Sequence, residues 1–314
     1  RRNLTGVRNM ADHVSKESIL GVIGLGNAGH AIASALAKLM PVHGYDLEED
    51  KRFSASQIGI ITHDQFDTFT EAIDVAILSL PHPEISFSVT EQLLGLETRP
   101  KLIIDTSTVT PKTASDCASL ASLHGVGFVD AAIAGGVASM ADGQMTFFMG
   151  GDDKSKAMAK PILNLVAAGI YDLGKTGAGM GIKVVNNAVM HALMVVLIEA
   201  FSMSKKLGVP NDTFISILNR EEGMLRPLVH RVQERMNEGN FEGGMSVTNA
   251  RKDSCLALET AQQLGVPLFA ISASHVPYEI AEANGLGPCD YAALSTLWED
   301  WVKIMFKENI NIRA

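Results

Sequence analysis

The sequence contains little cysteine: Cys117, Cys255 and Cys289 are the only three in 314 residues. They are widely spaced and form neither a Cys-x-x-Cys pair nor a run of cysteine and histidine, so we expect no disulfide framework and no zinc site. No metal cofactor is therefore expected. Free, scattered cysteines are typical of a reducing compartment, and we expect the protein in the cytoplasm.

Positive charge and long apolar runs are also scarce. The chain has 26 basic residues against 35 acidic ones, a net charge of −9, which argues against nucleic acid or an anionic membrane as its partner. The apolar stretch 188–200 is interrupted by His191 and Glu199 and is too short to span a bilayer. We therefore expect no membrane span.

The first 18 residues are polar and have no apolar core of the kind that a secretory signal needs. We expect residues 1–18 to be a disordered tail, with Met10 as the natural start and the residues before it as an addition. A trimmed mitochondrial transit sequence is the alternative.

A glycine-rich turn stands between a strand pattern and a helix pattern. The apolar run 19–23 leads into it, and small residues at helical spacing follow. Gly24 permits a tight turn, Gly26 lets a pyrophosphate approach the backbone, and Gly29 lets the helix pack closely on the strand. The N–H groups of the helix N-terminus favour phosphate. The residues predicted to bind a dinucleotide here are Gly24, Leu25, Gly26, Asn27, Ala28 and Gly29.

A second apolar run, 42–45, ends at Asp46. The spacing is that of an acid which accepts hydrogen bonds from the adenine-ribose hydroxyls of NAD. No arginine follows immediately, as a 2′-phosphate would favour, although Lys51 and Arg52 stand a few residues on. NAD is therefore expected rather than NADP, and the alternative is that Asp46 is only a turn residue.

Strand and helix patterns alternate through the first half of the chain, which predicts an α/β fold with a Rossmann-type, doubly wound and mostly parallel sheet. The strand-like runs are 19–23, 42–45, 59–62, 74–80, 102–105, 127–133, 145–149 and 170–173. Only helical patterns follow, at 178–207, 211–219, 224–238, 246–264, 268–283 and 290–307. With 46% hydrophobic residues, a chain of this length predicts two domains. We predict a dinucleotide-binding domain over 19–176 and an all-helical domain for substrate binding and oligomerisation over 177–314.

The expected helix 178–207 is apolar on nearly every face, so its own domain, the sheet domain or a second subunit must cover it. We expect a homodimer or homotetramer. Lys183 and Asn187 are polar exceptions four residues apart, and therefore share one face. Gly177 and Gly179 precede them and let another backbone or a ligand come close. The alternative is a solvent-facing lysine beside a locally bonded asparagine.

Several motifs in order resemble the β-hydroxyacid dehydrogenase family over about residues 19–305. They are the glycine turn, Asp105–Pro111, Asp130–Gly136, Gly177–Asn187 and Lys252-Asp253. The resemblance implies that Thr108 lies near the nicotinamide ribose and that Lys252 approaches the cofactor. Leu80 and Pro81, at the end of a strand-like run, are expected at the same edge.

The resemblance also implies the roles of the substrate residues. Lys183 is expected as general acid/base and Asn187 as the residue that orients the substrate oxygen. Ala134, Gly135 and Gly136 are expected to hold the substrate anion. Ala134 departs from the usual serine and Ala132 from the usual proline, and the missing hydroxyl removes one donor, worth about 1–3 kcal/mol if its partner is left unpaired.

The predicted activity is hydride transfer between NAD and a small anionic 3-hydroxy acid, or the matching oxo acid or semialdehyde. Two alternatives stay open: an imine reductase, which resembles the family in fold but generally lacks the lysine, and a non-enzymatic cofactor-binding protein. Arg226 is expected to be a solvated residue, with a clamp for a second carboxylate as the alternative.

Overall fold

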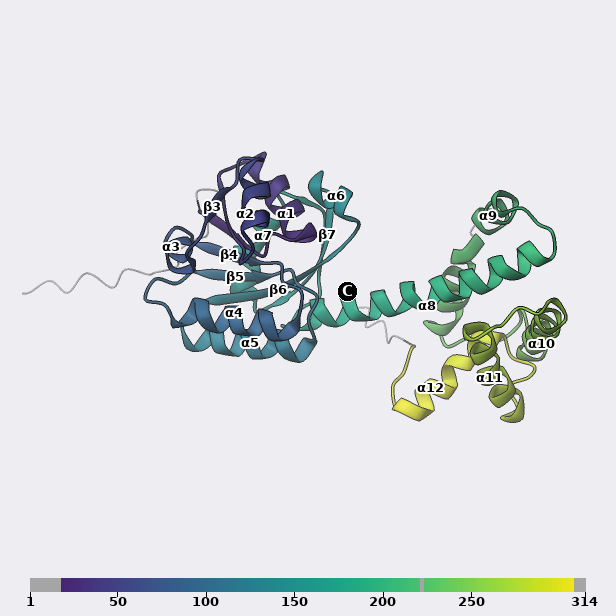
Figure 1. Cartoon of the computed structure of the whole chain (residues 1–314). Helices are drawn as coiled ribbons and strands as arrows, with labels where there is room; N and C mark the ends of the chain where they lie inside the picture. The colour runs from purple at the N-terminus through teal and green to yellow at the C-terminus, as the bar shows by residue number, and fades with distance from the viewer. Residues whose placement is uncertain (1–17, 221–222, 308–314) are drawn as a thin grey trace, which may run out of the picture. The chain divides into compact units, whose positions relative to one another are not determined.

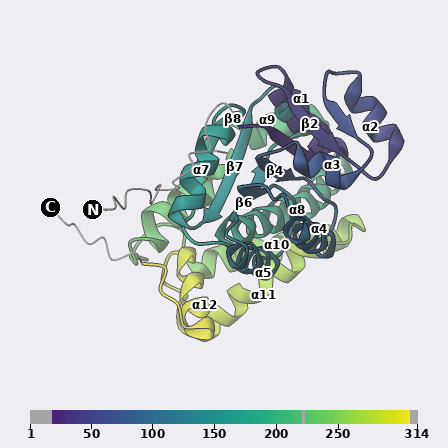
Figure 2. The ribbon, with the colours of Figure 1, turned by 90° about the vertical axis from the view of Figure 1, so that its left-hand side faces the viewer.

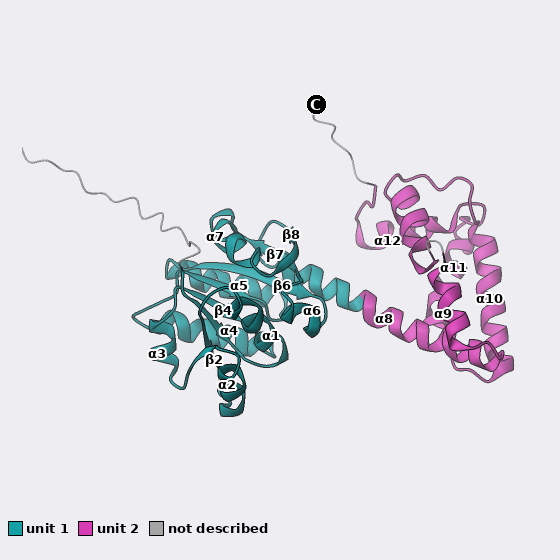
Figure 3. Ribbon diagram, turned by 90° about the horizontal axis from the view of Figure 1, so that it is seen from above, with its two compact units in different colours: residues 1–188 teal, residues 189–314 magenta. Residues whose placement is uncertain are grey.

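The computed structural model describes residues 18–220 and 223–307 and divides the chain into two compact units, Arg1–Ala188 and Val189–Ala314 (Figures 1 and 3). The units divide within helix α8 (Ala178–Lys206), further along the chain than the predicted boundary after residue 176. Of the expected tail, residues 1–17 lie outside the described residues, and Ser18 is buried.

The first unit contains one sheet of eight strands in the order β3-β2-β1-β4-β5-β6-β7-β8. The strands are β1 (Leu20–Ile23), β2 (Val42–Tyr45), β3 (Ile61–His63), β4 (Val75–Leu78), β5 (Leu102–Asp105), β6 (Gly127–Ala134), β7 (Met145–Gly151) and β8 (Ala167–Asp172). Every neighbouring pair is parallel except β6 and β7. The predicted doubly wound sheet is confirmed. Its edge strands β3 and β8 differ most from the predicted runs, because edge strands bury less and so have a weaker apolar pattern.

Helices cover both faces of this sheet (Figure 2). They are α1 (Asn27–Ala37), α2 (Glu49–Ser56), α3 (Phe66–Glu71), α4 (Pro83–Gly95), α5 (Pro111–Leu123), α6 (Val137–Ala141) and α7 (Asp153–Leu163). Successive residues of a strand face opposite sides, so Ile104 packs with α1 and α7, whereas Ile103 packs with α4 and α5. Each face therefore has its own apolar core.

The second unit is helical, as expected. After α8 come α9 (Asn211–Asn219), a 3₁₀ turn (Gly223–Leu225), a π-helix (Leu228–Met236), α10 (Val247–Leu264), α11 (Ala270–Ala283), a 3₁₀ turn (Tyr291–Leu294) and α12 (Ser295–Val302). The single helix predicted over 224–238 is wrong: it is split at Pro227, which has no N–H to donate. The helix predicted over 290–307 likewise begins as a 3₁₀ turn and ends at Lys303, whose φ is +56°.

Of the described helices, α8 is the one long and apolar enough to cross a membrane, with a mean hydropathy of 1.7 over 18 residues. The expectation that this stretch is too short considered residues 188–200 alone, and the 29-residue helix corrects it. One such helix is weak support for a span, since apolar helices of soluble assemblies have the same composition.

Candidate active site

The glycine turn between β1 and α1 is formed as the sequence predicts, and two of its glycines are required by packing. Gly24 has φ +88°, and a Cβ there would lie 2.3 Å from the carbonyl oxygen of Ser79. A Cβ at Gly29 would lie 1.8 Å from the carbonyl oxygen of Gly24. Neither position accepts a larger residue without moving the backbone.

Gly26 differs from these two, because a Cβ there would meet nothing within 4 Å. It is the N-cap of α1, and a cavity of about 510 Å³ opens beside it. Asn27 and His30 of α1 and Lys51 of α2 line this cavity. A phosphate group fits these surroundings, since free space meets the N-terminus of an eleven-residue helix.

Asp46 connects this turn to the end of β2. Its carboxylate accepts hydrogen bonds from the backbone N–H of Leu25 at 2.7 Å and of Glu48 at 2.9 Å, and the side chain is buried. Asp46 thus has the role of a turn residue, while each carboxylate oxygen keeps a lone pair for a ribose hydroxyl. Arg52 donates from Nη1 to the carbonyl oxygens of Asp46 and Leu47.

The ends of β4 and β5 are joined by a short chain of hydrogen bonds. Leu80 N–H donates to Oγ of Ser107 at 2.9 Å, and Ser107 N–H donates to Oδ1 of Asp105 at 2.9 Å. Burial raises the pKa of Asp105 to about 6. Pro81 and Thr108 follow these two strands and are exposed, so both lie at the carboxyl edge of the parallel strands, where α/β proteins bind ligands.

The start of α8 is bound to this same sheet by Asp130 of β6. Its carboxylate is fully buried and accepts hydrogen bonds from Gly177 N–H at 2.8 Å and Met180 N–H at 3.0 Å. A Cβ at Gly179 would lie 2.3 Å from the carbonyl oxygen of Phe148. The glycines at the start of α8, Gly177 and Gly179, therefore admit protein backbone, which was one of the two expected uses.

Lys183 and Asn187 follow on the next turns of α8, within the first unit, and both are half-buried. Desolvation by burial lowers the pKa of Lys183 from its usual 10.5. No hydrogen bond or ion pair holds the ammonium of Lys183 among the residues that the structure describes. The end of β6 carries Ala134, and the exposed Gly135 and Gly136 follow it; Gly135 has φ +135°.

Lys252 is placed in the second unit, near the start of α10, where it is exposed and pairs with Asp253 at 3.1 Å. Its approach to the cofactor stays a prediction. A further feature was not predicted: α10 and α11 bring Cys255, His275 and Glu279 together, although these residues are scattered in the sequence. The four-residue spacing of His275 and Glu279 was the available signal.

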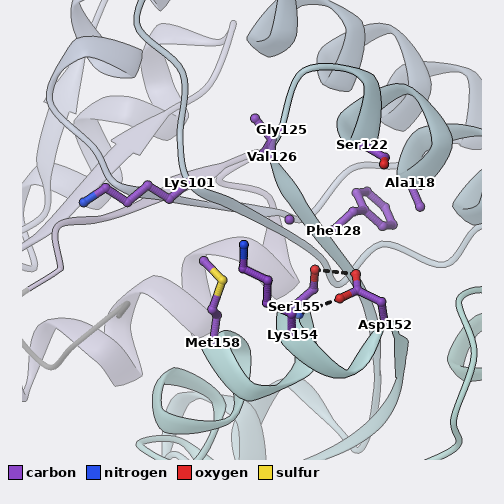
Figure 4. Close-up of a pocket in the computed structure, with 11 residues that line it drawn as sticks. Lys101, Ala118, Ser122, Gly125, Val126, Phe128, Asp152, Lys154, Ser155 and Met158 are labelled. Carbon is purple, nitrogen blue, oxygen red and sulfur yellow. Dashed lines mark hydrogen bonds between the residues drawn. The ribbon is translucent and has the colours of Figure 1, made fainter. Parts of the chain in front are cut away.

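Another cavity, of about 450 Å³, lies at the opposite ends of the strands from the glycine turn (Figure 4). Lys101, Gly125 and Val126 line it where β5 and β6 begin, and Asp152 and Lys154 line it at the start of α7. Figure 4 shows Asp152 bonded to Ser155, as expected of a helix cap. This cavity is therefore at the amino ends of the parallel strands and separate from the glycine turn.

Comparison with known proteins identifies the family of the chain. Residues 19–177 match the family model described as the NAD binding domain of 6-phosphogluconate dehydrogenase. Residues 177–298 match the one described as NAD-binding of NADP-dependent 3-hydroxyisobutyrate dehydrogenase. The chain is 29% identical to 2-(hydroxymethyl)glutarate dehydrogenase of Eubacterium barkeri, covering 91% of this chain and 96% of that one. It is 26% identical to mitochondrial 3-hydroxyisobutyrate dehydrogenase of Homo sapiens, covering 90% and 87%.

Solved structures of similar proteins also include a dehydrogenase of this kind. A 3-hydroxyisobutyrate dehydrogenase of Mycobacterium tuberculosis with L-serine matches at TM-score 0.62 and 27% identity, covering 89% of this chain and 99% of that one. An imine reductase from Pseudomonas sp. matches at TM-score 0.81 but only 18% identity, covering 90% and 99%, which shows a shared fold. The chain belongs to the β-hydroxyacid dehydrogenase family of NAD(P)-binding oxidoreductases.

Proposed function

We propose that the protein oxidises a small 3-hydroxy acid at C3, or reduces the matching oxo acid or semialdehyde, with Lys183 as general acid/base. NAD, when bound, takes up or supplies the hydride. The proposal rests on Lys183, which is half-buried and has no hydrogen-bond or ion-pair partner among the described residues, and which stands on a helix that Asp130 binds to the sheet.

The environment of Lys183 suits proton transfer. A neighbouring carboxylate would raise its pKa, whereas here desolvation lowers it, so more of the amine is unprotonated near neutral pH. The amine can take the proton of the C3 hydroxyl in oxidation, and the ammonium can return it in reduction. Asn187, one turn further on the same face, orients the substrate oxygen through its amide.

The substrate anion is assigned to Gly135 and Gly136. Both are exposed, and a Cβ at either position would meet nothing within 4 Å, so a carboxylate has room to approach this backbone. The named relatives act on 3-hydroxyisobutyrate and 2-(hydroxymethyl)glutarate, which are carboxylates. Ala134 supplies no hydroxyl, so the loop holds the anion through its backbone alone.

NAD is proposed over NADP because Asp46 places a carboxylate at the end of β2, where a 2′-phosphate would be repelled. The guanidinium of Arg52 is the competing feature, and its Nη1 is occupied by two backbone carbonyl oxygens. The preference for NAD over NADP thus depends on one charge, the carboxylate of Asp46.

Activity with NAD on a panel of C3 to C6 hydroxy acids tests the reaction, and Lys183→Ala tests the acid/base. We expect the variant to reduce kcat by about 10²- to 10⁴-fold with NAD affinity nearly unchanged. Lys206→Ala, an exposed lysine in the last turn of the same helix, is the matched control and should retain full activity. Survival of Lys183→Ala within about threefold of the wild-type rate would refute the assignment, and turnover of cyclic imines alone would favour an imine reductase.

A further inference from the structure

In the second unit, α10 and α11 lie side by side and bring three metal-ligating side chains together (Figure 3). Sγ of Cys255, on α10, lies 3.8 Å from Nε2 of His275, on α11. The same nitrogen lies 2.8 Å from Oε1 of Glu279, one turn further along α11. All three ligand atoms lie within 4.8 Å of one another.

These separations are close to those of a tetrahedral zinc site. Bonds of about 2.3 Å to sulfur and about 2.0 Å to nitrogen and oxygen, at the tetrahedral angle, place sulfur and nitrogen about 3.5 Å apart and nitrogen and oxygen about 3.3 Å apart. The differences from the observed distances are about half an ångström or less. Small side-chain rotations are therefore enough to admit the ion.

The outer partners of the cluster support ligation. Nδ1 of His275 lies 3.0 Å from Oγ of Ser254, and Nε of Arg251 lies 2.9 Å from Oε2 of Glu279. A ligating histidine usually donates from its other ring nitrogen, and a ligating carboxylate is usually held by its second oxygen. Ser254 can accept the Nδ1 proton when Nε2 turns its lone pair to a metal.

A His–Glu pair at i,i+4 with an arginine nearby is also a common surface ion network. Cys255 distinguishes this cluster, because a thiol contributes little to such a network but is a preferred zinc ligand. We propose that Cys255, His275 and Glu279 bind one Zn²⁺ and thereby tie α10 to α11, with the fourth position open to water. The thiolate and carboxylate balance the two charges of the ion, and the thiol proton is released on binding.

Metal titration of the full-length, chelator-treated protein tests this site without reference to catalysis. Cobalt(II) serves as the spectroscopic probe and Zn²⁺ as the calorimetric ligand. We expect one ion per chain, a thiolate-to-cobalt charge-transfer band, displacement of cobalt by zinc, and a zinc-dependent rise in melting temperature. Ser254→Ala should weaken zinc binding by about 10- to 100-fold.

Cys255→Ser should abolish the charge-transfer band and weaken zinc binding by more than the Ser254 variant does. Cys289→Ser is the matched control, a partly buried free cysteine elsewhere in the unit, and should change neither. If Cys255→Ser fails to fold, His275→Gln takes its place in the calorimetry. The absence of binding in the wild type, an unchanged affinity in the ligand variants, or an equal loss in Cys289→Ser would overturn the proposal.

Discussion

The two units of this protein are stabilised in different ways. The sheet unit has an apolar core on each face, and strands β1, β4 and β5 are entirely buried. Among the described residues of the helical unit, the buried apolar cluster consists of Val247, Ala281 and Leu297 with a few partly buried neighbours. The first unit therefore has the core of a self-sufficient domain, and the second does not.

In the helical unit, buried carboxylates hold helices together where the apolar core is small. Glu199 of α8 is 4% exposed and accepts hydrogen bonds from three backbone N–H groups at the start of α11. Asp290 is fully buried and pairs with Arg231 at 3.1 Å and Arg235 at 3.5 Å. Polar anchors fix the helices, but they bury little apolar surface.

Apolar surface therefore remains on α8. Val189, Met194 and Ile198 are each more than half exposed in the single chain. A second copy of the chain is the simplest cover for apolar surface of this kind. We propose that these side chains form the centre of a homodimer interface.

Introducing a charge on α8 tests the dependence of the helical unit on a partner, and we expect the largest effect here. Met194→Asp places two unpaired carboxylates in a twofold interface, which should weaken self-association by more than about 10³-fold. Light scattering at micromolar concentration measures this, with Met194→Leu as the control that keeps the apolar surface. A wild-type chain that is monomeric, or a dimer that tolerates the aspartate, would contradict the proposal.

Removal of Glu199 tests whether polar anchors hold the helical unit. Glu199→Ala leaves three backbone N–H groups without their acceptor and should cost about 3 kcal/mol of unfolding free energy. Burial raises the pKa of Glu199, but the backbone hydrogen bonds outweigh it and the net pKa is lowered. Its contribution should therefore be complete above the ordinary pKa of 4.5 and be lost as the pH falls through the lowered value. Denaturant unfolding at several pH values measures this, and equal stability of the two proteins at pH 7 would refute it.

Asp105 in the sheet unit should show the opposite dependence on pH. Its pKa is raised to about 6 from 3.8, so its ionisation destabilises the fold as the pH rises from about 4 through 6. Asp105→Asn removes this effect and should be about 2 kcal/mol more stable than the wild type at pH 7, below the limit of about 3 kcal/mol set by the pKa change. A stability difference that does not vary between pH 4 and pH 7 would show that the carboxylate is not responsible.

The smallest expected effect concerns the cofactor site of the self-sufficient unit. We expect kcat/KM with NAD to exceed that with NADP by at least about tenfold, or about 1.4 kcal/mol. Asp46→Ser should narrow this ratio, whereas Glu49→Gln, an exposed acid of α2, should not. Equal or better turnover by the wild type with NADP would refute the predicted preference for NAD.

Local patterns predicted most of the sheet unit. The alternation of buried strands and amphipathic helices is a periodic signal, and the glycine turn is a requirement of backbone space that a Cβ at Gly24 or Gly29 violates. The limits of β3 and β8 were not predicted, because the apolar patterns of these edge strands are weak. The split at Pro227 was missed although a proline within a helical pattern indicates a break, since it has no N–H to donate. The family resemblance located Lys183 and Asn187, but no local pattern showed how their helix is attached.

The sequence by itself determined the fold class, the dinucleotide turn and the shared face of Lys183 and Asn187, since each depends on residues that are near neighbours along the chain. Only the tertiary structure decided that Asp130 binds the start of α8 from 47 and 50 residues away and that Glu199 caps α11 from about 70 residues away. The same holds for Cys255, which meets His275 across two helices. Such contacts depend on how whole elements pack, and the periodicity of one segment carries no information about the side chains of another.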